Sequence, residues 1–148
     1  MKEIKQRVVN NVYGDCFSAC MASLLELPIE VLPNDHSEAW FFIWEVFLKQ
    51  FGLAISSGRA DGPIWHDYPW IATVKSKNFK NDSHVIIMDD GGNVLFDPSP
   101  KKTYKKGESL LGKNVVTQGY TIAVSDFTKL HKLKEYREKL AQQKEKMK

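Results

Sequence analysis

The spacing of apolar residues changes at Gly52, and this change limits the folds open to the chain. Before Gly52, apolar side chains recur at helical intervals in segments 16–27 and 37–51. After it, β-branched and aromatic runs are separated by turn residues, which is typical of strands. These runs cover 53–57, 70–76, 84–88, 93–97 and 120–126. Helices followed by a series of strands predict an α+β domain with an antiparallel sheet.

Local signals predict where these elements begin and end. Asp15 is a favourable N-cap for the first helix, and Ser37 is the expected cap of the second, which Gly52 ends. The segment 28–32 predicts a short additional helix between them. The sequence "DDGG" at 89–92 predicts a hairpin turn between two strands.

The charge is concentrated at the C-terminal end. Phe127 to Lys148 contains eight Lys or Arg and three Asp or Glu, a net +5 within a chain of net +3, so the preceding 126 residues carry −2. We expect one domain over 1–126 and a basic helical tail over 127–148, docked weakly or used for self-association. The mixed signs favour a solvated helix face over a nucleic-acid-binding surface. The apolar stripe expected on this helix consists of Leu130, Leu133, Tyr136 and Leu140.

The overall composition predicts a globular cytoplasmic protein. Its apolar fraction of 43% is ordinary for such proteins. No apolar run approaches the roughly 18 residues of a membrane span. The N-terminal segment "MKEIKQRVVNN" lacks the apolar core and cleavage site of a signal peptide. The oligomeric state is left open.

Both cysteines lie in the first predicted helix. One helical turn apart, Cys16 and Cys20 are poorly placed for a disulfide, and a single C-x3-C lacks the second ligand pair of a zinc site. We therefore expect neither a metal nor a cofactor. Cys20 fits a small buried apolar side chain. Cys16 follows the N-cap at the positive end of the helix dipole, which favours a nucleophilic thiolate.

A nucleophilic thiol needs a base and a group that orients the base. Among the four histidines, His84 opens a strand whose hairpin partner ends at Asp97. A four-residue turn places these two side chains directly opposite, and a two-residue turn places them diagonally on one face. An odd-length turn breaks the pairing unless a bulge restores it. A structural His–Asp pair on the solvent face is the alternative.

Two stretches together resemble a known family. They are "GDCFSACMASLLELPIEVLP" and "SHVIIMDDGGNVLFDPSP", and they resemble the papain-like cysteine peptidase fold, in particular small C39-peptidase-like proteins of bacteria and phages. The resemblance spans about Lys5 to Pro100 and does not cover the tail from Lys101 on. It implies N-terminal helices packed on an antiparallel sheet.

The resemblance also implies catalytic roles. Cys16 corresponds to the nucleophile, His84 to the general base and acid, and Asp97 to the orienting carboxylate. The chain departs from the pattern at Asp15, where the family often has Asn. A carboxylate facing the sulfur would disfavour the thiolate, whereas a capping carboxylate points into the helix turn.

A further implied role is that of an oxyanion-hole donor. The family usually supplies a Gln shortly before the nucleophile, acting beside the nucleophile's own backbone N–H. Gln6 fits this placement best, and Asn10 and Asn11 are the nearer substitutes.

These residues predict a thiol hydrolase or acyltransferase that acts on an amide, isopeptide or thioester bond of a peptide or protein. One alternative is a catalytically inactive binding protein on the same scaffold, phage-borne and directed at a host protein. Another is a nucleic-acid-associated accessory protein that uses the basic tail.

The aromatic residues Trp65, Tyr68 and Trp70 are expected to form a wall over a cleft beside His84, or to pack against the helix at 37–51.

Overall fold

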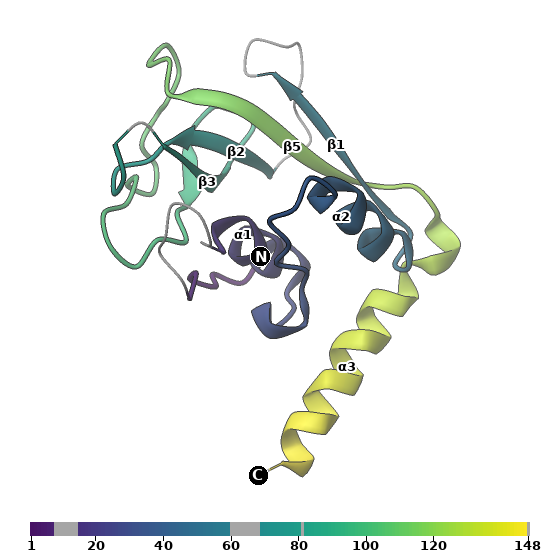
Figure 1. Cartoon of the computed structure of the whole chain (residues 1–148). Helices are drawn as coiled ribbons and strands as arrows, with labels where there is room; N and C mark the ends of the chain where they lie inside the picture. Colours follow the sequence, from purple (N-terminus) through teal and green to yellow (C-terminus); the bar gives the residue numbers. More distant parts are fainter. Residues whose placement is uncertain (8–14, 60–68, 81, 148) are drawn as a thin grey trace.

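The computed structural model describes residues 1–7, 15–59, 69–80 and 82–147, and they form an α+β unit, as predicted (Figure 1). Within these ranges no helix is long and apolar enough to cross a membrane. In chain order the helical elements before the sheet are α1 (Cys16–Leu25), the 3-10 helix η1 (Ile29–Val31) and α2 (Trp40–Lys49). The strands are β1 (Leu53–Arg59), β2 (Trp70–Lys75), β3 (Ser83–Met88), β4 (Val94–Phe96) and β5 (Val116–Val124). The 3-10 helix η2 (Phe127–Lys129) and α3 (His131–Lys146) follow.

The five strands form one antiparallel sheet in the order β1-β5-β2-β3-β4. The last strand therefore lies inside the sheet, between the first two. Figure 1 shows α1 and α2 against the same side of the sheet. Alternate residues of β2 and β3 serve two apolar clusters: Ile71 and Ile87 face the helices, whereas Ala72 and Ile86 face the segment after β4.

The second helix begins later than the sequence suggests. Ser37 is not its N-cap, because α2 starts at Trp40 and Ala39 occupies the cap position. Ser37 instead belongs to a turn before the helix, in which its N–H and hydroxyl donate to the carboxylate of Asp35. Its hydroxyl oxygen accepts from the Ala39 N–H at 3.2 Å. Local side-chain hydrogen bonds of this kind compete with helix formation.

The C-terminal helix is docked on the domain by its predicted stripe. Figure 1 shows that α3 leads away from the sheet. Arg137 of α3 donates from Nε to the Leu25 carbonyl at 2.8 Å, at the C-terminal end of α1. The stripe residues in contact with the helix-side core are Leu130, Leu133, Tyr136 and Leu140.

The turn between α2 and β1 depends on Gly52. It has a φ of 73°, and a Cβ added there would lie 2.1 Å from the Asp126 carbonyl oxygen. We expect Gly52→Ala to lower the free energy of unfolding by at least about 3 kcal/mol, since left-handed strain and a backbone clash combine. Gly112 has the same φ with nothing within 4 Å of an added Cβ, so Gly112→Ala is expected to cost only about 1 kcal/mol. Urea denaturation of both variants measures the difference, and equal losses would contradict it.

Candidate active site

The two thiols of α1 lie in different environments. Cys16 is half-buried at the first position of the helix, and Cys20 is fully buried one turn further along. The Cys20 thiol donates to the Val85 carbonyl at 3.5 Å. Burial raises the pKa of Cys20 well above its ordinary value, and the charges of Cys16 and Asp97 add to the effect. Cys20 is therefore a protonated core residue, whereas Cys16 is accessible.

His84 stands between a carboxylate and the accessible thiol. It is the second residue of β3 and is buried, with 7% of its surface exposed. Its Nε2 lies 2.6 Å from Asp97 Oδ1. Cys16 also contributes to the raised pKa of His84, so the two side chains lie close enough to interact. Since Nε2 is engaged by Asp97, Nδ1 is the ring atom left for the sulfur.

The contact between His84 and Asp97 arises by a different route from direct opposition. The hairpin turn is odd-length: Asp89 N–H donates to the Asn93 carbonyl at 2.9 Å, and Gly92 between them has a φ of 78°. A β-bulge between Ile87 and Met88 then shifts the strand register by one residue and compensates for the odd-length turn. The resulting pairs are Ile87↔Phe96 and Met88↔Val94. Asp97 consequently lies just beyond β4 and diagonal to His84, so the directly opposed pairing is wrong.

Backbone groups hold the Asp97 carboxylate in place. Its Oδ1, besides facing His84, accepts from the Ser99 N–H at 2.9 Å. Its Oδ2 accepts from the Tyr104 N–H at 2.8 Å. Only 4% of Asp97 is exposed. Both oxygens are thus fixed as hydrogen-bond acceptors, and the imidazole is oriented by a carboxylate that cannot rotate freely.

The surroundings of His84 favour its charged form. Burial alone lowers the pKa of His84, but the hydrogen bonds to Asp97 and Cys16, together with the charges of both residues, raise it to about 9. The imidazole is therefore protonated at neutral pH. An imidazolium hydrogen-bonded to a sulfur stabilises the thiolate, which is the nucleophilic form of cysteine.

This protonation predicts a pH-dependent stability. The pKa of His84 rises from 6.5 to about 9 on folding, so its contribution is complete below pH 6.5 and is lost as the pH rises through about 9. We expect the free energy of unfolding to fall by up to about 3 kcal/mol across this window. The His84→Ala variant should lack the decline. The exposed His131 is the matched control, since His131→Ala should retain it. Urea denaturation at several pH values tests this, and an identical decline in all three proteins would contradict it.

The N-terminal segment brings Gln6 to the site. Gln6 is buried, and its backbone N–H donates to the Pro98 carbonyl at 2.9 Å, directly after Asp97. The next residue, Arg7, donates its backbone N–H to Asp15 Oδ1 at 2.9 Å, directly before Cys16. Gln6 is thus held between Pro98, which follows Asp97, and Asp15, which precedes Cys16. The substitutes Asn10 and Asn11 lie outside the described residues.

Asp15 occupies the N-cap position of α1 without capping it by its side chain. Its carboxylate instead forms an ion pair with Arg7, Nε to Oδ2 at 3.2 Å, while the Asp15 side chain is fully buried. The prediction of a capping carboxylate is therefore wrong. A buried carboxylate requires a charged partner more than a helix end requires a cap. Because Arg7 compensates the charge, Asp15 opposes a thiolate at Cys16 less than an isolated carboxylate would.

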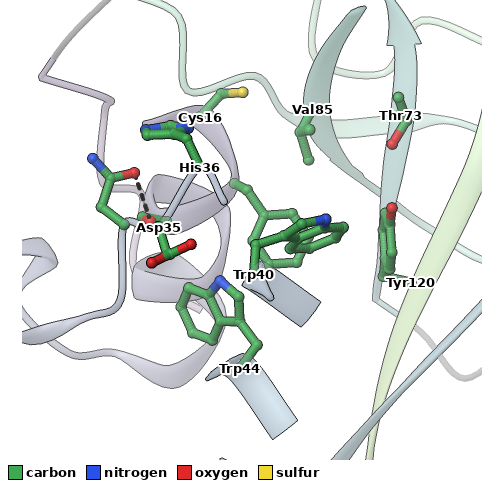
Figure 2. Close-up of a pocket in the computed structure, with 11 residues that line it drawn as sticks. Cys16, Asp35, His36, Trp40, Trp44, Thr73, Val85 and Tyr120 are labelled. Carbon is green, nitrogen blue, oxygen red and sulfur yellow. Dashed lines mark hydrogen bonds between the residues drawn. The ribbon is translucent and has the colours of Figure 1, made fainter. Parts of the chain in front are cut away.

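A cavity of about 350 Å³ opens beside the Cys16 thiol (Figure 2). Among the described residues, its aromatic wall comes from α1, α2 and β5. Trp65 and Tyr68 lie outside the described residues. Trp70 does not pack against the helix at 37–51, because it is buried in the cluster on the sheet face away from α1 and α2 and donates from Nε1 to the Asp89 carbonyl at 2.7 Å. It pairs with Met88, at the far end of β3 from His84, so it does not adjoin His84 either. The lining residues are Cys16, Phe17, Ser18, Asn34, Asp35, His36, Trp40, Trp44, Thr73, Val85 and Tyr120.

A sequence signal for this wall was present. Trp40 and Trp44 are spaced i, i+4, so they lie on one face of their helix. What the sequence did not indicate is that this face lies opposite Cys16. Among the described residues, no group of three or more His, Cys, Asp or Glu side chains is arranged to hold a metal ion.

Comparison with models of known protein families and with curated proteins gave no match for this chain, so the chemistry of the site rests on its own geometry.

Proposed function

We propose that the chain is a thiol hydrolase or acyltransferase with a papain-like fold, acting on a peptide-like acyl bond. The observation that carries the proposal is that His84 is hydrogen-bonded to the buried Asp97 carboxylate and interacts with the accessible Cys16. The raised pKa of His84 supports it, because the imidazole is charged where a leaving group needs a proton. The order helix-borne Cys, strand-borne His and carboxylate also fits the resemblance to papain-like peptidases.

Each residue has a defined task in the first half of the reaction. The Cys16 thiolate attacks the substrate carbonyl carbon, and the carbonyl electron pair moves to oxygen. In this proposal the Cys16 N–H and the Gln6 side-chain amide donate to that oxyanion. The His84 imidazolium then gives its Nδ1 proton to the leaving amine or thiol as the bond to carbon breaks. A thioester at Cys16 and a neutral His84 remain.

The second half restores the enzyme. Water, or an acceptor amine in acyl transfer, loses a proton to neutral His84 as it attacks the thioester carbon. The carbon–sulfur bond breaks, and the electron pair returns to Cys16 as thiolate. Asp97 keeps the imidazole in one tautomer and stabilises its charged form throughout.

The proposal is tested by labelling the whole chain with a vinyl-sulfone probe at pH 7 and measuring its intact mass. We expect one adduct, located at Cys16 by peptide mapping, and a labelling rate at least tenfold lower in His84→Ala. Cys20 is an internal control, because it should stay unlabelled in both proteins as long as they are folded. Equal labelling of the two thiols, or an unchanged rate without His84, would overturn the proposal. It would favour the inactive binding protein.

A further inference from the structure

The cavity beside Cys16 has a rigid aromatic wall. Phe17 contacts Trp40 and Trp44 edge-on, each at a centroid distance of 5.4 Å, and Tyr120 at 5.3 Å. Trp40 and Tyr120 are also in edge contact at 5.8 Å. Each ring is thereby held by at least one other, so the wall keeps its shape when the cavity is filled. Figure 2 shows Trp40 between Trp44 and Tyr120.

The lining also has polar groups: Thr73 and Tyr120 lie at one end of the cavity, and Ser18, Asn34, Asp35 and His36 also line it. Burial raises the pKa of Tyr120, and a hydrogen bond with Thr73 partly offsets the rise. Thr73 and Tyr120 lie together in Figure 2, with Val85 nearer to Cys16. This end of the cavity therefore combines two hydroxyl groups with the apolar side chain of Val85.

The rim carries negative charge. Asp35 lines the cavity, and hydrogen bonds from the Ser37 side chain and backbone lower the pKa of its carboxyl group. It is therefore ionised at neutral pH. A substrate with an acidic residue at this rim is disfavoured by like-charge repulsion.

We propose that this cavity receives an aromatic side chain on the acyl side of the bond that Cys16 attacks. The inference rests on the proposed function, because that function supplies the bond that reacts. The cavity itself follows from the structure and does not depend on that function. Its volume lies at the lower end of the range for small-ligand sites, which suits one large side chain better than a whole small molecule. Rings that meet the Phe17, Trp40 and Tyr120 faces gain edge or offset contacts that a glycine or alanine side chain cannot make.

The first test uses thioesters of acetyl-Phe-Gly, acetyl-Gly-Phe and acetyl-Gly-Gly and follows acylation of Cys16 by intact mass. We expect at least one Phe-containing thioester to acylate Cys16 with a kcat/KM about tenfold or more above that of Gly-Gly. The better of the two identifies which residue enters the cavity. Equal rates for all three would overturn the proposal and leave the proposed function standing.

Two variants link the preference to the cavity. Thr73→Leu fills the cavity from β2, so it should lower the ratio of the Phe rate to the Gly-Gly rate severalfold. Thr117 is the matched control: it is exposed on β5 and does not line the cavity, so Thr117→Leu should leave the ratio unchanged. A ratio that falls equally in both variants would contradict a role for the cavity.

A second measurement does not depend on catalysis. In the Cys16→Ala variant, N-acetyl-phenylalanine amide should change tryptophan fluorescence saturably, whereas N-acetyl-glycine amide should not. Trp40 and Trp44 are the reporters, since both line the cavity. If the phenylalanine amide binds but the wild-type protein is not acylated, the proposed function is refuted and the proposed aromatic pocket stands. If there is neither binding nor acylation, the proposed function and the aromatic pocket are both refuted.

Discussion

Replacing Cys16 with Ala is expected to abolish turnover while changing the free energy of unfolding by no more than about 0.5 kcal/mol. Under the proposed function the sulfur forms the covalent intermediate, and no neighbouring side chain can replace it. Cys20 is the nearest thiol, but it is fully buried and donates to the Val85 carbonyl. Because Cys16 is only half-buried, its removal leaves no closed cavity. Hydrolysis of a peptide thioester and urea denaturation measure the two effects.

Cys20→Ala is the matched control on the same helix. It removes one sulfur from a fully buried position, so it should cost about 1 kcal/mol of stability and leave turnover largely intact. If both variants lost activity in proportion to a shared loss of stability, both thiols would be structural. The proposed function would then lose its nucleophile.

Replacing Asp97 with Asn is expected to reduce turnover by at least 100-fold and to destabilise the protein by about 1–3 kcal/mol. Both carboxylate oxygens accept backbone N–H groups, from Ser99 and from Tyr104. An amide has only one oxygen, so its NH2 group must face a buried N–H donor in either orientation. The His84 imidazole also loses the charge that raises its pKa. Thioester hydrolysis and urea denaturation test this.

The control for that variant is Asp89→Asn in the hairpin turn. Oδ1 of Asp89 accepts the N–H groups of Gly91 and Asn93, and Oδ2 faces the Asn93 side-chain amide, which can reverse its orientation. An amide at 89 therefore keeps its hydrogen bonds, and turnover should be unchanged. Loss of activity in Asp89→Asn equal to that in Asp97→Asn would show that hairpin distortion, and not the carboxylate at the site, is responsible.

Local patterns were sufficient to predict the elements and the separate environments of the two thiols. The helix from Cys16 and the strand containing His84 follow from apolar spacing, which is a property of neighbouring residues. Counting residues along the hairpin limited the positions of Asp97 relative to His84 to a few: directly opposite, diagonal on the same face, or unpaired unless a bulge intervenes. It could not choose among them, because the bulge depends on the Asp89 turn and on the packing of β3 against β4.

Contacts between distant segments account for what could not be predicted. The pairing of Asp15 with Arg7 requires the N-terminal segment to pass the start of α1, and no local signal encodes that path. The surroundings of Trp70 could not be predicted, because an aromatic residue at a strand start fits either face of a sheet. The wall formed by Trp40 and Tyr120 joins a helix to the last strand of the sheet, so it exists only in the folded chain.

The N-terminal segment has a consequence for how the protein is made. Lys5 donates from Nζ to the Asp97 carbonyl at 3.0 Å, across a sequence separation of 92 residues. During synthesis the thiol of Cys16 leaves the ribosome long before the segment that holds Asp97. Closing so long a loop carries an entropic cost that only the nearly complete domain can offset. Under the proposed function, a nascent or truncated chain therefore holds a thiol without its base and carboxylate, and hydrolytic power is withheld until folding is nearly finished.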